Sequence, residues 1–201
     1  MQKRTVIATI AATMLFAAQA ATALTPGTAA PPFTITDTAG KAVKLADYRG
    51  KYVVLEWTNP ECPFVRKHYD SGNMQGLQKE WGAKEVVWLA VNSTSQSHSE
   101  FKAPAQMDGW MKAQGAAPSA TLIDATSAIG RDYGAKTTPH MFVVDPAGRI
   151  IYAGAIDDKR SANPADAKTA NNYVRAALTQ ALAGKPVTVA STTPYGCSVK
   201  Y

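Results

Sequence analysis

The chain has 201 residues, of which 46% are hydrophobic and 18% are charged, and its formal net charge is +6 at pH 7. This composition excludes a disordered or fibrous protein. The length is enough for one domain with a full core. No run of Lys and Arg is longer than two residues, so nucleic acid is not an expected partner.

The first element in chain order is an expected export signal. Lys3 and Arg4 precede an uncharged run over residues 5–18, and Ala21-Thr22-Ala23 places small residues where a signal peptidase cleaves. We expect residues 1–23 to be a signal peptide and the mature chain to be periplasmic or otherwise exported, where a disulfide can persist. An uncleaved anchor is the alternative, but the run is short for a membrane span and no later segment resembles one.

After this signal, strands and helices alternate in one domain over residues 24–185, and residues 186–201 form a tail that carries the second cysteine. Hydrophobic periodicity and turn residues predict the elements. We expect a hairpin of strands 33–37 and 41–45, a strand at 52–57, a helix from residue 62 to 81 interrupted near 71–72, a strand at 85–91, a helix at 107–114, a strand at 120–123, a helix at 126–133, a hairpin of strands 141–144 and 149–152, and a last helix at 166–182.

The segment around Cys62 is a candidate active site, because it lies where an apolar strand turns into a helix. At a helix start, unpaired N–H groups and the positive end of the helix dipole favour thiolate over thiol. Arg66, Lys67 and His68 would add positive potential there, while Glu61 would oppose it. We therefore expect Cys62 to be a reactive thiol; a buried structural cysteine is the alternative.

The order of these elements, with a cysteine opening the first main helix and Thr138-Pro139 preceding the last hairpin, resembles the thioredoxin fold. The implied fold class is α/β, with a central mixed sheet flanked by helices and an N-terminal β-hairpin. That hairpin, the polar segment after the second central strand and residues 143–149 resemble the branch of alkyl hydroperoxide reductases, thiol-specific antioxidants and exported thioredoxin-like proteins. The resemblance covers residues 32–185.

The resemblance implies an enzyme, a thiol-disulfide oxidoreductase or a peroxiredoxin-like antioxidant. Cys62 matches the redox-active cysteine, and Thr138 and Pro139 match the cis-proline loop that packs against it. The implied partners are a peroxide, or a protein or small-molecule disulfide, as substrate, and a reducing thiol that regenerates the enzyme. No cofactor is expected.

The chain also departs from the patterns of both branches. Val65 stands where thioredoxins have their second active-site cysteine, which excludes a local Cys-x-x-Cys dithiol. Leu55 and Asn59 replace the proline and threonine of the peroxiredoxin pattern Pro-x-x-x-Thr-x-x-Cys. Asn59 could still offer a peroxide a hydrogen bond, and either Arg66 or Arg131 is a candidate for polarising it.

Cys197 is the other cysteine of the chain, and the tail around it contains Pro186, Pro194 and Gly196, which fit poorly in a packed element. At up to about 3.3 Å per residue, this tail can span the domain. We expect Cys197 to resolve the intermediate formed on Cys62, so that the tail moves between two states. The alternative is a permanent staple, worth roughly 4–5 kcal/mol, in a non-catalytic binding module.

His140 directly follows the expected cis-proline, where it could orient substrate or act as a general acid. With Cys62 and Cys197 it also allows a rival hypothesis, a copper-binding protein, because thiolate and imidazole suit copper. We favour the redox enzyme, without a metal. His68 and His98 are expected to face solvent.

Overall fold

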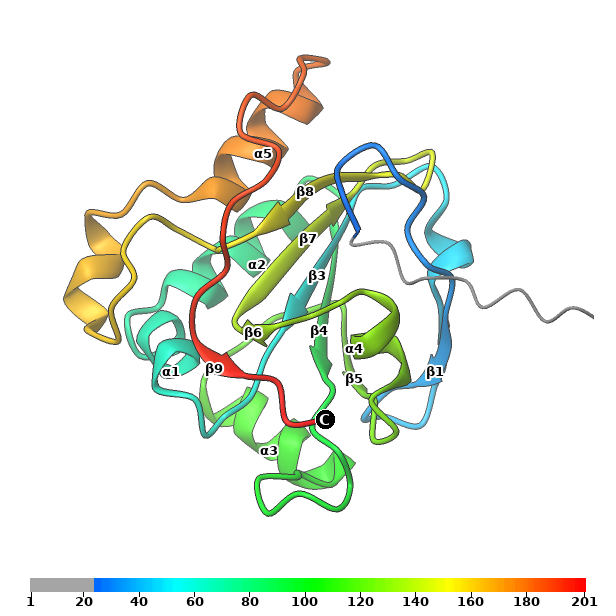
Figure 1. Cartoon of the computed structure of the whole chain (residues 1–201), viewed down its shortest axis with the longest axis vertical. Coiled ribbons are helices and arrows are strands. Elements are labelled where there is room, and N and C mark those ends of the chain that lie inside the picture. The colour runs from blue at the N-terminus through cyan, green and yellow to red at the C-terminus, as the bar shows by residue number, and fades with distance from the viewer. Residues whose placement is uncertain (1–23) are drawn as a thin grey trace, which may run out of the picture.

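The computed structural model describes residues 24–201, so the expected signal peptide lies outside the described residues. The centre is a five-stranded sheet in the order β5-β4-β3-β7-β8 (Figure 1). The strands are β3 (Val53–Trp57), β4 (Val87–Asn92), β5 (Ala120–Ile123), β7 (His140–Val144) and β8 (Ile150–Gly154). β3 runs parallel to β4 and antiparallel to β7, which confirms the expected mixed sheet.

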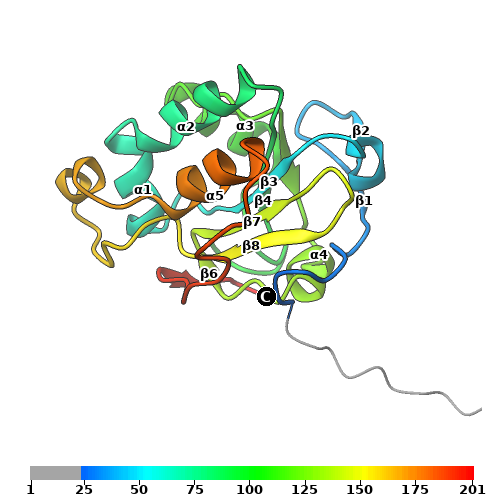
Figure 2. The same ribbon diagram turned by 90° about the horizontal axis from the view of Figure 1, so that it is seen from above.

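Helices cover one face of this sheet, and a short helix with the N-terminal hairpin covers the other (Figures 1 and 2). The first face carries α1 (Pro63–Asp70), α2 (Asn73–Gly82), α3 (Pro104–Ala113) and α5 (Tyr173–Leu182). The second carries α4 (Ala128–Asp132), β1 (Thr34–Thr36), β2 (Ala42–Lys44) and the 3-10 helix η1 (Leu45–Tyr48). Because β3 and β4 are covered on both faces, every residue in them is buried, as their nearly continuous apolar sequences predict.

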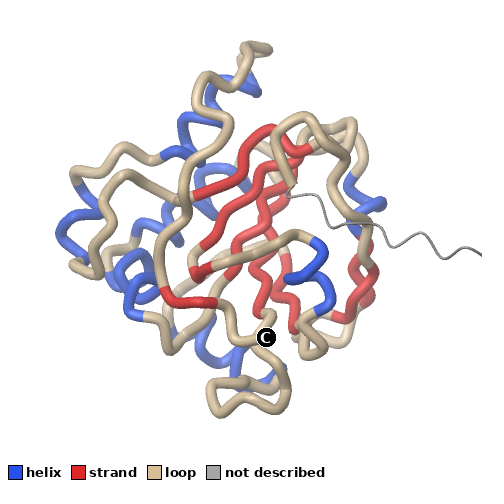
Figure 3. The backbone as a smooth tube through the Cα atoms, in the orientation of Figure 1, coloured by secondary structure: helices blue, strands red, loops and turns tan. Residues whose placement is uncertain are grey.

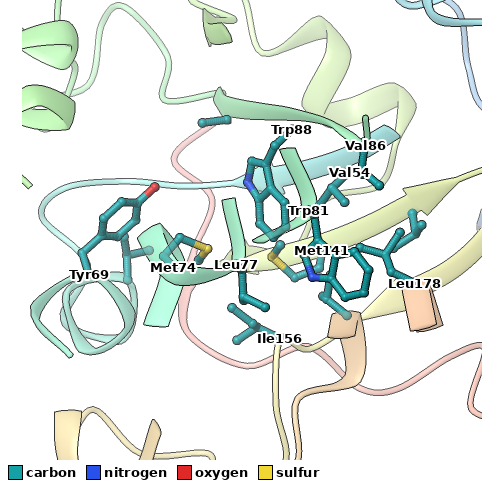
Figure 4. Close-up of a cluster of buried hydrophobic side chains, with 14 of the residues drawn as sticks. Val54, Tyr69, Met74, Leu77, Trp81, Val86, Trp88, Met141, Ile156 and Leu178 are labelled. Carbon is teal, nitrogen blue, oxygen red and sulfur yellow. The ribbon is translucent and has the colours of Figure 1, made fainter. Parts of the chain in front are cut away.

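The core beneath the helices is built on large side chains from several elements (Figure 4). Trp81 of α2, Trp88 of β4 and Met141 of β7 are each at most 1% exposed, and Cys62 belongs to the same cluster. The core on the opposite face gathers around Trp57 and Phe142. The candidate nucleophile therefore lies on the helix-covered side of the sheet.

The structure corrects the last expected helix. Residues 166–182 do not form one helix, since a 3-10 helix, η2 (Pro164–Lys168), ends before α5 begins at Tyr173. The physical reason is the side chain of Asn172, which accepts a hydrogen bond from the Arg175 amide at 2.8 Å and so caps a new helix start. The interruption near residues 71–72 is confirmed: Gly72, with φ of 73°, lies between α1 and α2.

The tail is packed against the domain, contrary to the expectation that it fits no element. Ser191 forms a parallel bridge with Ala153 of β8. Further on, β9 (Cys197–Ser198) pairs with β6 (Thr137–Thr138) as a short antiparallel ladder, visible between loops in Figure 3. Over residues 24–201, no helix combines the length and apolar character needed to cross a membrane.

Candidate active site

Cys62 is the N-cap residue of α1, where the sequence places it. Its backbone is extended, with φ of −79° and ψ of 119°, and Pro63 follows in the first turn, where a proline loses no helical hydrogen bond. The Cys62 side chain is almost completely covered, with 1% of the residue exposed. Its Sγ donates a hydrogen bond to the carbonyl oxygen of Thr138 at 3.0 Å.

The loop at Thr138 and Pro139 meets Cys62 from the other side of the site. The Thr138–Pro139 peptide bond is cis, which confirms the prediction for this loop. In the β6–β9 ladder, Thr138 lies opposite Cys197. Gly196 allows this close approach, because a Cβ atom there would lie 2.0 Å from the Thr138 carbonyl oxygen. The tail thus brings Cys197 to the residue that already binds Cys62.

The two cysteines are free thiols in this structure, and Cys197 packs against the cluster that contains Cys62. Burial raises the pKa of Cys197 to about 12, and hydrogen bonding and charge interaction with Cys62 add to the shift. Cys197 is therefore protonated at neutral pH while the tail is docked. For it to attack as a thiolate, its surroundings must change.

Glu56 is a buried carboxyl that the sequence reasoning missed. It lies in β3 with no exposed surface, and accepts hydrogen bonds from the Tyr69 hydroxyl at 2.9 Å and the Trp88 indole at 2.8 Å. Burial raises its pKa to about 7, although these hydrogen bonds act in the opposite direction. A lone acidic residue within an apolar strand, six positions before Cys62, was the available signal. Glu56 can exchange a proton near neutral pH on the face that carries Cys62.

The positive charges expected beside Cys62 are either paired with other groups or absent. Lys67 is fully buried and forms an ion pair with Asp157 at 3.3 Å. His68 is also fully buried, contrary to the expected solvent exposure, and burial lowers its pKa to about 3, so its ring is neutral. Arg66 donates to the Pro60 carbonyl at 2.7 Å and pairs with Glu61 at 3.3 Å.

Two of the side chains considered for peroxide binding, those of Asn59 and Arg131, have other partners. The Asn59 side chain donates to Glu100 at 2.8 Å and accepts from the Glu61 amide at 2.8 Å, so both ends of its amide are engaged within the loop. Arg131 lies on α4, and its guanidinium stacks over the Tyr201 ring at 4.6 Å. α4 packs on the sheet face opposite the Cys62 cluster.

His140 also faces away from Cys62. In β7, residues alternate between faces, and the His140 ring packs 4.5 Å from that of Phe142, in the opposite core. Its Nδ1 accepts a hydrogen bond from the Lys136 amide at 3.2 Å, and burial lowers its pKa to about 3. A neutral imidazole cannot serve as the expected general acid.

The copper hypothesis receives no geometric support from these positions. Cys62 and Cys197 meet at the cis-proline loop, but His140 does not join them. Within residues 24–201, no group of three or more His, Cys, Asp and Glu side chains is placed to hold a metal ion. His98 is half-buried, and its Nδ1 accepts from the Glu100 amide at 3.1 Å.

Comparisons with known proteins point to redox chemistry. Residues 26–153 match the AhpC/TSA family. The thioredoxin-like protein YneN of Bacillus subtilis is 31% identical over 135 residues, which cover 66% of this chain and 74% of that protein. The thiol-disulfide oxidoreductase ResA of Bacillus thuringiensis is 27% identical over 132 residues, which cover 62% and 66%. The crystal structure of an uncharacterized conserved protein from Geobacillus kaustophilus superposes with a TM-score of 0.77 at 29% identity, covering 88% of this chain and 92% of that one.

Proposed function

This chain belongs to the AhpC/TSA family, and we propose that it is an exported thiol-disulfide oxidoreductase in which Cys62 is the nucleophile and Cys197 resolves the intermediate. The observation that carries the proposal is the β6–β9 ladder, which sets Cys197 opposite the residue that binds the Cys62 thiol. The relatives named as thioredoxin-like protein and thiol-disulfide oxidoreductase support the same chemistry.

The reaction is a two-electron exchange of thiols and disulfides. The Cys62 thiolate attacks one sulfur of a substrate disulfide, forming a mixed disulfide, and the other substrate sulfur leaves as a thiolate that takes up a proton. Cys197 then loses its proton and attacks the Cys62 sulfur. The second substrate thiol is released, and the Cys62–Cys197 disulfide remains. A dithiol partner reduces this bond and restores both thiols.

This cycle requires the tail to move. In the docked state Cys62 is covered, and its thiol proton is held by the Thr138 carbonyl. Release of the tail exposes Cys62, breaks the β6–β9 pairing and frees the edge of β6 for an extended segment of substrate. Cys197 returns after the first step. Cys62 is then bonded to substrate, so its thiol no longer raises the pKa of Cys197.

The geometry favours a disulfide over a peroxide as substrate. Asn59, the residue in place of the peroxiredoxin threonine, already binds Glu61 and Glu100. Arg131 stacks on Tyr201, and Arg66 binds the loop of Pro60. A peroxide at Cys62 would therefore lack the expected polarising groups.

Turnover by the purified protein tests this proposal. Reduction of a protein disulfide and of hydrogen peroxide would each be measured with an excess of dithiol, using wild type, Cys62→Ser, Cys197→Ser and the neighbouring exposed control Ser198→Ala. We expect faster turnover of the disulfide, no activity in Cys62→Ser, and at least a tenfold loss in Cys197→Ser with accumulation of a mixed disulfide at Cys62. Full turnover in Cys197→Ser would overturn the resolving role, and faster turnover of peroxide would assign a peroxidase.

A further inference from the structure

We propose that Tyr195 is a positioning residue for the exchange between Cys62 and Cys197, and that its phenol locks the tail to α1 by binding the buried Lys67–Asp157 ion pair. This inference rests on the proposed function. It adds a side chain that controls how often Cys197 is in place.

Tyr195 is the buried anchor of the tail, with 5% of its surface exposed, in a segment whose neighbouring residues are half-buried or exposed. Its hydroxyl donates a hydrogen bond to the Asp157 carboxylate and accepts one from Lys67 Nζ at 3.1 Å. Its ring packs edge-on against Phe64, with the ring centres 5.9 Å apart. The tail is thus held by both polar and apolar contacts.

The ion pair that receives the phenol is enclosed on all sides. The side chains of Lys67 and Asp157 are 0% and 1% exposed. Lys67 Nζ also donates to the Lys159 carbonyl at 2.6 Å, and the Lys159 amide donates to Asp157 at 3.0 Å. Buried charges need all their hydrogen-bonding positions filled. The tail therefore supplies a partner that this buried pair requires.

The neighbouring groups keep this interaction stable around neutral pH. His68 Nε2 lies 3.5 Å from the Tyr195 oxygen and 3.9 Å from Asp157, and burial keeps its ring neutral. Burial and the Asp157 carboxylate together raise the pKa of Tyr195, so the phenol stays protonated and can donate. Asp158 also raises this pKa, and Arg160 acts in the opposite direction.

Tyr195 and its partner Lys67 each lie close in sequence to one of the two cysteines, so their contact sets how near Cys197 lies to Cys62. α1 begins next to Cys62 and carries Lys67 about one turn further on, so one helix links the nucleophile to the Lys67 side of the anchor site. In the tail, Tyr195 stands two residues before Cys197, with Gly196 pressed against Thr138. Fixing Tyr195 therefore fixes Cys197 near Cys62, which raises its effective concentration there.

The test uses Tyr195→Phe, which keeps the ring against Phe64 and removes only the hydroxyl. Two rates report on the tail in opposite directions. The first is alkylation of Cys62 in a Cys197→Ser background, where a docked tail protects the thiol. The second is release of glutathione from a mixed disulfide at Cys62 by Cys197, where a docked tail is required. Alkylation of Cys62 is measured in the double variant Tyr195→Phe with Cys197→Ser. Release of glutathione is measured in Tyr195→Phe alone.

Loss of a hydrogen bond to a charged group predicts that alkylation of Cys62 becomes about tenfold to hundredfold faster, and that release of glutathione becomes about tenfold slower. Tyr52→Phe is the matched control. The Tyr52 hydroxyl donates to the Ala181 carbonyl at 3.1 Å, and Tyr52 lies at the opposite end of β3 from Cys62. Its loss should change neither rate.

Each outcome can be assigned. Unchanged rates in Tyr195→Phe would overturn the role of Tyr195 while leaving the cysteine exchange intact. A rise in both rates would indicate a general loosening of the domain and would also overturn it. Failure of wild-type Cys197 to release glutathione from Cys62 would instead reject the proposed function itself.

Discussion

Cys197 lies directly opposite Thr138 in an antiparallel ladder of two residue pairs. Since the Thr138 carbonyl also accepts the hydrogen bond of the Cys62 thiol, one residue of the cis-proline loop organises both cysteines. Only a protonated Cys62 can make that bond. The docked tail thus brings Cys197 to the same carbonyl group, and in the proposed cycle its release uncovers Cys62.

Replacement of Gly196 by Ala is expected to undock the tail. The new Cβ would lie 2.0 Å from the Thr138 carbonyl oxygen, and the backbone φ of 138° is one that L-residues rarely adopt. Hydrogen exchange of the tail amides should show the loss: the Val199 amide, which bonds the Lys136 carbonyl in the docked tail, should exchange at least tenfold faster.

Gly184→Ala is the control for that experiment. Gly184 also has a positive φ, of 69°, but its Cβ would meet no atom within 4 Å. We expect a loss of about 1 kcal/mol in overall stability and unchanged protection of Val199. Equal protection in Gly196→Ala and Gly184→Ala would contradict close packing of the tail on the cis-proline loop.

Ionisation of Glu56 is expected to weaken the fold as the pH rises. Its pKa is about 7 in the folded protein and 4.5 when unperturbed, so the folded state binds more protons between these values. The free energy of unfolding should therefore fall between about pH 4.5 and 7, by up to about 3 kcal/mol from this group. Urea unfolding at pH 5 and pH 8 should show a smaller decrease in Glu56→Gln, and the wild-type decrease in the exposed control Glu85→Gln. The same decrease in all three proteins would contradict this prediction.

His140 should make the free energy of unfolding rise with pH, in contrast to Glu56. Its pKa is about 3 in the folded protein against 6.5 when unperturbed, so the unfolded state binds more protons in this range and acid destabilises the fold. At pH 4.5 this loss is about 2–3 kcal/mol relative to pH 7. In His140→Gln the difference in unfolding free energy between the two pH values should shift by this amount in favour of the acid state, whereas His98→Gln should resemble wild type. If His140→Gln also resembles wild type, His140 is not buried as a neutral ring.

Export predicts removal of the first 23 residues or so. Lys3, Arg4 and the uncharged run after them are the basis, and cleavage after Ala23 would lower the formal charge from +6 to +4. Intact-mass measurement of the protein recovered from an envelope fraction should show a chain that starts near Leu24. A mass that includes Met1 would refute cleavage.

The elements that the sequence predicts well are those whose signals are local. Strand β5 was placed at its observed bounds, and the corner at Cys62 followed from an apolar strand, a turn and Pro63. The alternation of side chains along β7 also predicts which way His140 points, because His140 shares a face with Phe142 rather than with Met141.

What the sequence did not predict depends on partners far away along the chain. Lys67 and His68 look like exposed helix residues until Asp157, 90 residues from Lys67, and Tyr195, 128 residues from it, supply their partners. β9 has two residues and no apolar run, so its pairing with β6 had no periodic signal. Tyr195 and Gly196 were the informative residues, but their roles depend on surfaces made by α1 and Thr138.

The most direct test of this account is a redox titration of the Cys62–Cys197 pair in the full protein, equilibrated with thiol and disulfide buffers and read by mass spectrometry after trapping free thiols. Structural disulfides in exported proteins typically have potentials below about −300 mV. Because the tail is held by non-covalent contacts that must release in each cycle, we predict a bond that forms reversibly with a potential above this value. A potential below about −300 mV, or no bond between these cysteines under oxidising conditions, would contradict the resolving role of Cys197.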